Sequence, residues 1–370
     1  MNGLIKHQLK TRAMCDFFII AGEHSGDQHA AALVKELRGR GFEVAGVGGP
    51  AMKAAGAELL FDMTQLSVVG FFEVLKHWRV FKDYFDRIFH WIDKNRPSRV
   101  IFVDYPGFNL RLAKRLFDAG IAHKAGGPIR LLYYIAPQVW AWKAKRRFAM
   151  AKVLDALSVI FPFEVDCFAD TTLPTTFVGH PFAEADFHNS IRFDAHGQLL
   201  LLPGSRQAAV KRIFPKMLDV LDALGAQQEA AVLYPSESML ALLKTLAGNR
   251  TIAFVPYGTA VKARAALMSS GTISLLCGLA GIPGIILYRA HPLTYWLGKK
   301  LAKIPHLGIV NLLLKAPIYP EFIQNIQPKI VLDALQTAAD QPQFYHEQAN
   351  RVRSLLTHSK ATSLADWAIQ

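Results

Sequence analysis

Short apolar segments alternate along the chain with longer segments whose apolar residues recur at helical spacing. In the first half, strands are predicted at 16–21, 43–47, 99–104, 130–135, 156–160 and 175–178, and helices at 28–39, 71–95, 110–119 and 143–153. Apolar strands that alternate with helices are typical of βαβ units, in which helices cover both faces of a parallel sheet. The first half is therefore predicted to be a doubly wound α/β domain.

The same alternation restarts after a polar break at 181–197. Strands are predicted at 198–202, 230–234, 252–255, 271–274 and 284–288, with a helix at 208–224. We therefore predict two doubly wound, Rossmann-like domains, with a boundary near residue 185. Ligands of such sheets bind beyond the carboxyl ends of the strands, so a cleft between the domains is expected to hold the site.

Composition narrows the possible partners and the compartment. The chain has 370 residues and is 51% hydrophobic, which excludes a disordered protein, and its formal net charge of +13 favours an anionic partner. Nucleic acid, anionic lipid and a phosphorylated substrate all fit that charge.

The cysteines, Cys15, Cys167 and Cys277, show no metal-ligand or disulfide spacing, and no apolar run is long enough to span a bilayer. A cytoplasmic protein is expected, because the basic start has no signal-peptide core.

The first predicted strand ends in an unusual cluster of polar residues. The segment AGEHSGD (21–27) places Glu23, His24, Ser25, Gly26 and Asp27 between the strand and the next helix. Ser25 and Asp27 could cap that helix while Gly26 makes the turn. Capping does not explain Glu23 and His24, so a binding or catalytic role for the loop is favoured.

A second polar cluster follows the strand at 99–104. Asp104 ends the strand, and Asn109 precedes a basic helix. A carboxylate at the end of a strand facing a cleft can act as a general base. The alternative is that Asp104 caps a turn with Pro106 and Gly107 and that Asn109 is an N-cap.

Two small-residue turns in the second half suit a phosphate. Each joins a predicted strand or small-residue segment to a helix, and together they contain Gly204, Ser205, Arg206, Ser270, Gly271 and Thr272. Glycine lets a phosphate approach the backbone, helix-start N–H groups point at it, and Arg206 can pair with it. An ordinary capped turn is the alternative. Because neither GxxxxGK[ST] nor GxGxxG occurs, an ATPase or a dinucleotide-dependent enzyme is disfavoured.

The predicted helix at 71–95 carries more aromatic residues than one buried face needs. Aromatic side chains stand both on and off its apolar stripe, beside several basic residues, and the segment at 137–147 adds Trp140 and Trp142. This composition favours contact with anionic lipid, and the alternative is a helix buried between the sheet and a neighbour. The predicted membrane-contacting residues are Phe71, Phe72, Lys76, Trp78, Arg79 and Lys82. Single-stranded nucleic acid would also suit the tryptophans and lysines, but no RNA-binding signature occurs.

Taken together, these segments resemble the lipid-A-disaccharide synthase family, inverting GT-B-type glycosyltransferases (family 19) of Gram-negative envelope synthesis. The resemblance spans nearly the whole chain in order. It is carried by AGEHSGD (21–27), GVGGPAMKAAG (46–56), VVGFFEVL (68–75), DYPGFN (104–109), APQVWAWKAKR (136–146), PFE (162–164), GHP (179–181), LLPGSR (201–206), SSGT (269–272), YR (288–289), NLL (311–313) and PEFIQ (320–324).

The resemblance implies a reaction and its partners. The 6-hydroxyl of 2,3-diacylglucosamine 1-phosphate attacks the anomeric carbon of UDP-2,3-diacylglucosamine, which gives a β-1′,6-linked disaccharide and UDP. It implies no metal and no other cofactor. Anionic inner-leaflet lipid is a further implied partner, nucleic acid is not, and the protein would be peripheral on the cytoplasmic side of the inner membrane.

The resemblance also implies roles for single residues. Asp104 matches the family's essential aspartate and is expected to be the catalytic base. Glu23, His24, Ser25, Asp27 and Asn109 are expected to bind the acceptor or sugar, and the nucleotide-binding set is Gly204, Ser205, Arg206, Ser270, Gly271, Thr272, Asn311 and Glu321.

The resemblance further implies a domain organisation. Residues 1–185 would bind the acceptor and lipid, and 186–344 would bind the UDP-sugar. A C-terminal helix at about 345–370 would return to the first domain, within one chain or by exchange in a homodimer.

Three positions depart from the family pattern. Ala209, Leu276 and Gly107 stand where the family often has acidic residues. Alternative functions are another UDP-N-acetylglucosamine-using enzyme of this architecture, such as a lipid-linked glycosyltransferase or an epimerase, and a non-catalytic protein of the membrane surface.

Overall fold

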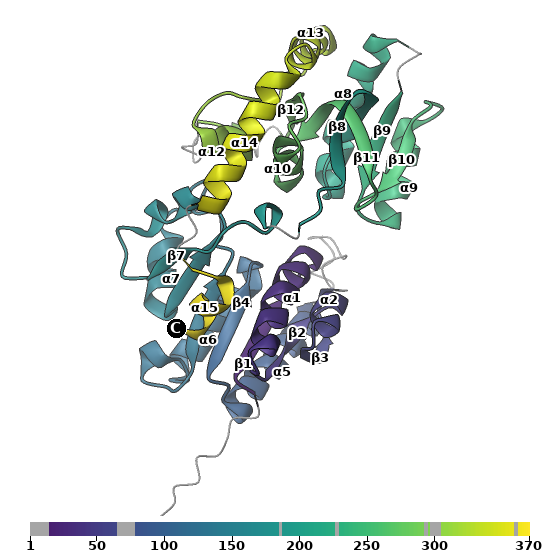
Figure 1. Cartoon of the computed structure of the whole chain (residues 1–370). Coiled ribbons are helices and arrows are strands. Elements are labelled where there is room, and N and C mark those ends of the chain that lie inside the picture. Colours follow the sequence, from purple (N-terminus) through teal and green to yellow (C-terminus); the bar gives the residue numbers. More distant parts are fainter. Residues whose placement is uncertain are drawn as a thin grey trace, which may run out of the picture. The chain divides into compact units, whose positions relative to one another are not determined.

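The structure is a computed structural model that describes residues 15–64, 78–184, 187–225, 229–291, 295–296, 305–358 and 362–370 (Figure 1). Contacts divide the chain into two compact units. The first unit comprises Met1–Val139, Lys143–Gly179 and Lys360–Gln370, and the second comprises Trp140–Trp142 and His180–Ser359.

The first unit is built around one seven-stranded sheet with the order β3-β2-β1-β4-β5-β6-β7. Every neighbouring pair is parallel. The strand order reverses between β1 and β4, and doubly wound sheets bind their ligands at such a switch point. The strands are Phe17–Ala21 (β1), Val44–Gly48 (β2), Glu58–Asp62 (β3), Arg99–Val103 (β4), Arg130–Tyr134 (β5), Ala156–Val159 (β6) and Thr175–Phe177 (β7).

Helices cover both faces of this sheet. Because side chains alternate along a strand, Phe18 and Ile20 of β1 pack with α5, α6 and α7, whereas Phe17 and Ile19 pack with α1 and α15. Strands buried on both faces explain the near-continuous apolar runs in the sequence. The helices are His24–Gly39 (α1), Pro50–Ala54 (α2), Trp78–Asn95 (α5), Pro106–Asp118 (α6), Arg146–Val153 (α7) and Leu364–Ile369 (α15), with short 3₁₀ turns at His123–Ala125, Pro162–Glu164 and Asp166–Phe168.

The end of the chain packs on the first unit. Leu364 and Trp367 of α15 are buried in the same apolar cluster as α1, and Figure 1 shows this yellow helix beside the strands of the first unit. Arg99 and Arg130 donate hydrogen bonds to the carbonyl groups of Ile369 and Gln370, respectively. The segment expected at about 345–370 is thus two helices: α15 in the first unit and α14, Pro342–His358, in the second.

The second unit has a six-stranded sheet with the order β10-β9-β8-β11-β12-β13. Its neighbouring strands are again parallel, and the order reverses between β8 and β11. Helices α8, α9 and α13 share one apolar cluster with the sheet, while α10 contacts β8 and β11 and packs with α12 and α14. The strands are Ile191–Leu202 (β8), Ala230–Tyr234 (β9), Ala253–Pro256 (β10), Val261–Ser269 (β11), Gly284–Tyr288 (β12) and Glu321–Ile323 (β13).

The helices of the second unit include one segment that was predicted to be a strand. They are Gln207–Leu224 (α8), Glu237–Ala247 (α9), Thr272–Leu279 (α10), Ile309–Leu314 (α12), Pro328–Ala339 (α13) and α14, and a 3₁₀ turn covers Pro181–Ala183. The prediction of a strand at 271–274 was wrong, because Gly271 is the N-cap of α10 and the strand ends before it. Among the described residues, every helix falls short of the length and apolar content that crossing a bilayer requires.

Candidate functional site

The carboxyl ends of β1 and β4 meet at the switch point of the first sheet. The strands pair with Ala21 opposite Val103, so the loops that follow them start side by side. After β1, Glu23 is the N-cap of α1 and is partly exposed, while His24 and Ser25 begin α1 and are exposed. The structure therefore brings this loop and the Asp104 loop to one edge of the sheet, where such sheets place their ligands.

Asp104 follows β4 in a backbone conformation that is uncommon for a residue with a side chain. Its φ is +46°, and that of Tyr105 is +48°, so two consecutive residues adopt the left-handed region. Each such residue costs on the order of 1–3 kcal/mol and persists where its surroundings enforce it, typically at functional sites. The turn directs the chain from β4 into α6, whose N-cap is Tyr105.

Hydrogen bonds fix the main chain of Asp104 on both sides of its Cα. Its N–H donates to the carbonyl of Tyr134 over 2.9 Å. Its carbonyl accepts from the hydroxyl of Tyr133 over 2.6 Å and from Nδ2 of Asn109 over 2.7 Å. Tyr133 and Asn109 are fully buried, whereas Asp104 is partly exposed. The arrangement holds a partly exposed aspartate on a fixed main chain.

The structure gives Asn109 a role that neither interpretation of the sequence predicted. Asn109 lies in the first turn of α6 and is not its N-cap, so the N-cap role predicted for Asn109 is wrong. Its Nδ2 also donates to the carbonyl of Val103 over 3.2 Å, and its Oδ1 has no hydrogen-bond partner among the described residues. Because the side chain is fully buried, its observed role is to hold the turn that carries Asp104.

Asp27 is also a structural residue in this site. It is fully buried, and its carboxylate accepts backbone hydrogen bonds from Gly49 (2.8 Å), Ala51 (2.9 Å) and Met52 (3.0 Å). These N–H groups begin α2, so Asp27 joins α1 to the segment after β2. It does not cap its own helix, which starts at His24 with no side-chain cap. Its observed contacts indicate a positioning role in place of direct sugar binding.

The second sheet repeats this arrangement at its own switch point. β8 and β11 pair with Leu202 opposite Met268, so the turns that follow lie side by side. Gly204 (φ +99°) and Gly271 (φ +137°) make these turns in a conformation that favours glycine. The turns approach each other closely, since a Cβ on Gly204 would lie 3.0 Å from Oγ of Ser269.

Both glycine turns lead into helices with accessible N-termini. Arg206, the N-cap of α8, is exposed together with Ser205. Thr272, the first residue of α10, is exposed, and Ser270 is partly exposed. The first N–H groups of a helix have no partner within the helix and favour an anion, and a guanidinium adds charge. The paired turns form a candidate site for a diphosphate.

Asn311 and Glu321 fix the segment that leads into α12. Nδ2 of Asn311 donates to the Tyr319 carbonyl and to Glu321, each over 2.8 Å, and its Oδ1 accepts from the Tyr319 N–H over 2.9 Å. The Glu321 carboxylate also accepts from the N–H groups of Leu307 and Gly308, each at 2.9 Å. Because Asn311 is fully buried and its amide is fully occupied, its observed role is structural. Glu321 is partly exposed.

The predicted membrane-contacting residues fall largely outside the described side chains. Phe71, Phe72 and Lys76 lie outside the described residues, Trp78 and Arg79 are described only as helical backbone, and Lys82 is exposed. Further along α5, Trp91 stacks on Phe18 at 4.4 Å between ring centroids, and Arg115 lies 4.0 Å from the ring centroid of Phe89. In this later part of α5, the aromatic residues pack within the first unit.

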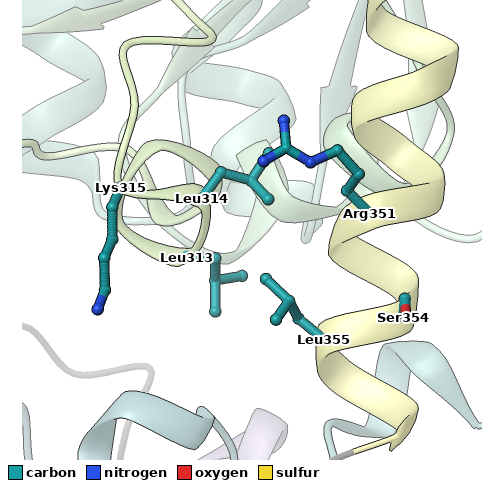
Figure 2. Close-up of a pocket in the computed structure, with 6 residues that line it drawn as sticks. All are labelled: Leu313, Leu314, Lys315, Arg351, Ser354 and Leu355. Atoms are coloured by element: carbon teal, nitrogen blue, oxygen red, sulfur yellow. The ribbon is translucent and has the colours of Figure 1, made fainter.

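A groove in the second unit lies between α12 and α14 (Figure 2). Its volume is about 320 Å³. Figure 2 shows Leu313 and Leu355 pointing toward one another, with Lys315 and Arg351 on opposite sides. It is lined by Leu313, Leu314, Lys315, Arg351, Ser354 and Leu355, which include none of the predicted site residues.

Two features of the site were not predicted from the sequence: the role of Tyr133, and the close packing of the Tyr105 ring against the backbone of Gly22. Tyr133 lies within a predicted strand and received no role, although a buried tyrosine hydroxyl usually needs a hydrogen-bond partner. That rule could have indicated a structural role for Tyr133.

Among the described residues, no group of three or more histidine, cysteine, aspartate or glutamate side chains could hold a metal ion.

Comparisons with known proteins add independent evidence. Residues 17–364 match the family described as "Lipid-A-disaccharide synthetase". A lipid-A-disaccharide synthase of Nitrosococcus oceani is 36% identical over 343 residues, which cover 87% of each chain. Among solved structures, the glycotransferase of kitacinnamycin matches with a TM-score of 0.59 at 14% identity, over 95% of this chain and 97% of that one. The UDP-GlcNAc 2-epimerase of Neisseria meningitidis matches with a TM-score of 0.60 at 9% identity, over 95% of this chain and 97% of that one. These two likenesses support the predicted GT-B-like fold.

Proposed function

The chain belongs to the lipid-A-disaccharide synthase family, and we propose that Asp104 is the base of its glycosyl transfer and that the glycine turns of the second unit hold the nucleotide. The chain is a glycosyltransferase that makes the lipid A disaccharide.

The proposed donor is UDP-2,3-diacylglucosamine, and the proposed acceptor is 2,3-diacylglucosamine 1-phosphate. As the acceptor's 6-hydroxyl oxygen attacks the anomeric carbon, Asp104 takes the hydroxyl proton. The new C–O bond forms on the face opposite the leaving group, so configuration inverts and the linkage is β-1′,6. The bond from the anomeric carbon to the diphosphate oxygen breaks, and UDP leaves with the electron pair.

One observation carries the assignment of Asp104. It is a partly exposed aspartate at the switch point of the first sheet, on a left-handed main chain that the buried side chains of Tyr133 and Asn109 hold by hydrogen bonds. A base needs both access to the substrate and a fixed position. Glu23, His24 and Ser25 start from the neighbouring strand and are accessible, so they are proposed to bind the acceptor or sugar hydroxyls.

The nucleotide is proposed to bind at the switch point of the second sheet. The N-termini of α8 and α10 and the guanidinium of Arg206 would stabilise the negative charge that grows on the departing diphosphate. Ser205, Ser270 and Thr272 would donate hydrogen bonds to it. Gly204 and Gly271 would allow close approach, and Glu321 with Asn311 would shape the adjoining wall.

Both proposed substrates carry acyl chains, so we propose peripheral binding to anionic lipid on the cytoplasmic face of the inner membrane. Support comes from the net charge of +13 and from Trp142 and Phe148, whose exposed fractions are 51% and 48%. Basic and aromatic side chains together suit a lipid interface. A flotation assay tests this proposal: the protein should float with vesicles that contain anionic lipid and should not float with neutral vesicles.

A C-terminal exchange between two copies remains part of the proposal. In the structure α15 packs on the first unit of its own chain, and the same contacts would serve in an exchanged homodimer. Sedimentation equilibrium of the full chain, compared with a variant whose α15 is removed, would detect such a dimer.

One incubation separates the proposed function from the alternatives. The purified chain is mixed with the proposed donor and acceptor, and mass spectrometry is used to look for the tetra-acylated disaccharide phosphate and UDP. A second reaction omits the acceptor, and a third uses UDP-N-acetylglucosamine as donor. Product only in the complete reaction supports the proposal. Turnover of UDP-N-acetylglucosamine alone would indicate an epimerase or a related transferase, and no turnover by a folded protein would indicate a binding protein.

A further inference from the structure

We propose that Tyr133 is a positioning residue for glycosyl transfer, because its buried hydroxyl fixes the main-chain turn that presents Asp104. The inference rests on the proposed function, in which Asp104 is the base. It assigns Tyr133 no contact with substrate and no proton transfer.

Tyr133 and its neighbour in β5 bind both polar groups of the Asp104 main chain. The carbonyl of Tyr134 accepts the Asp104 N–H, and the hydroxyl of Tyr133 donates to the Asp104 carbonyl. β5 pairs with β4 so that Tyr133 lies opposite Phe102, and the Tyr133 side chain therefore reaches to the residue that follows β4. One strand thus determines the peptide geometry on each side of the Asp104 Cα.

The tyrosine ring itself is held in place. Tyr133 is fully buried, and its ring lies 6.1 Å from that of Phe102 between centroids. Burial raises the pKa of its phenol well above the ordinary value, so the hydroxyl remains a donor at any physiological pH. A rigid donor of this kind restrains the carbonyl it binds.

The restraint matters because the turn is strained. A φ of +46° at Asp104 and +48° at Tyr105 persists only under enforcement. The Asp104 carbonyl accepts hydrogen bonds from Nδ2 of Asn109 and from the hydroxyl of Tyr133, and loss of the hydroxyl removes the shorter of these two. The turn could then relax and move the carboxylate away from the acceptor hydroxyl.

The test is Tyr133→Phe in the full chain, which removes the hydroxyl and keeps the ring. We expect kcat to fall about 10- to 100-fold, since a base displaced by about 1 Å can lose that much rate. The KM values of both substrates and the Kd of UDP should change less than about two-fold, because ground-state binding does not use the displaced group.

Tyr319→Phe is the matched control. Tyr319 is buried in the second unit, and its hydroxyl donates to the carbonyl of Ile282 over 2.9 Å. Ile282 precedes β12, so this hydrogen bond lies at the sheet edge opposite the glycine turns. The control also loses a hydrogen bond from a buried tyrosine hydroxyl to a main-chain carbonyl, and it keeps the main-chain groups of Tyr319 that bind Asn311. We expect its kcat to stay within about two-fold of the parent while its thermal stability falls as in Tyr133→Phe.

The outcomes separate this inference from the proposed function. Asp104→Asn is measured in parallel, and near-parental activity in that variant would overturn the base assignment and this inference with it. An inactive Asp104→Asn with a Tyr133→Phe kcat equal to the parent's would overturn the inference alone. Equal loss of kcat in Tyr133→Phe and Tyr319→Phe would show a purely structural effect and would also overturn it. A selective loss in Tyr133→Phe, with Asp104 shifted in its crystal structure, supports it.

Discussion

The ring of Tyr105 lies against the backbone of Gly22, so closely that a Cβ on Gly22 would lie 2.3 Å from Cδ1 of Tyr105. This contact joins the loop after β1 to the turn after β4. Glycine is therefore required at position 22 by the position of the residue next to Asp104. The two loops of the first sheet edge form one packed structure.

Gly22→Ala is expected to displace the Tyr105 ring and, with it, the turn that carries Asp104. Overpacking of this kind costs about 1–3 kcal/mol of unfolding free energy, and kcat should fall at least about 10-fold. Steady-state kinetics and urea unfolding measure the two effects. Gly39→Ala is the control, because a Cβ there meets nothing within 4 Å. Equal kinetics for the two variants would contradict the coupling of the loops.

Asp27→Ala is expected to destabilise the first unit by about 3 kcal/mol or more. The substitution leaves three backbone N–H groups at the start of α2 without their acceptor, and hydrogen bonds to a charged group are worth about 1.5–3 kcal/mol each. Urea unfolding checks this, with the exposed Glu36→Ala in the same helix as control. A fully stable Asp27→Ala protein that had lost only sugar binding would restore the direct-binding role.

Arg206→Ala is expected to weaken UDP binding by about 2–3 kcal/mol, through loss of a charge-assisted contact with the diphosphate. Isothermal titration calorimetry with UDP measures the change. Lys211→Ala, which removes an exposed charge further along α8, should change the Kd less than about two-fold. Unchanged affinity in Arg206→Ala, or the same loss in both variants, would refute the placement of the diphosphate at this turn.

His29 is expected to make the first unit less stable as pH falls. Burial lowers the pKa of its imidazole to about 4, against 6.5 in the ordinary state. Between pH 6.5 and pH 4, the unfolded chain therefore binds a proton that the folded chain does not. The contribution of neutral His29 to the free energy of unfolding is complete above pH 6.5 and is lost as pH falls through this window. At pH 5 the loss is at most about 2 kcal/mol, because the ring is partly exposed.

The measurement for His29 is a comparison of pH profiles. Thermal unfolding of the parent and of His29→Gln is followed from pH 7.5 to 4.5, and the parent should lose more stability across the window. Carboxylates titrate in both proteins, so the difference between the two curves isolates His29. Superimposable curves would show that His29 does not contribute.

The sheets and their ligand edges could be predicted from the sequence because buried parallel strands are nearly continuous apolar runs. β1, β4 and β5 were predicted to within a residue or two of their observed ends. β3 was missed because it is a partly exposed edge strand with little apolar contrast, and β13 because it has only three residues. β11 was missed although it lies inside the second sheet, because Lys262 and Arg264 interrupt its apolar run. The false strand at 271–274 was a helix start, where small residues give no periodic signal.

The roles of polar residues were harder to predict than their positions. Asp27, Asn109 and Asn311 lie next to the predicted sites, but their side chains already bind main-chain groups. Asp27 binds the start of α2, Asn109 binds the carbonyl of Asp104, and Asn311 binds the carbonyl of Tyr319. A sequence shows which residues follow a strand and not which side chains are already occupied. The two left-handed positions, Asp104 and Tyr105, are not glycines, so their residue types do not indicate this conformation.

The central claim is that Asp104 removes the proton from the acceptor hydroxyl, and single-turnover kinetics of Asp104→Asn tests it most directly. With saturating donor and acceptor, disaccharide formation is followed by mass spectrometry, while UDP affinity and the unfolding midpoint are measured on the same protein. We predict a rate at least about 100-fold below the parent's, as for loss of a general base, with UDP affinity and stability unchanged. A rate close to that of the parent would contradict the account.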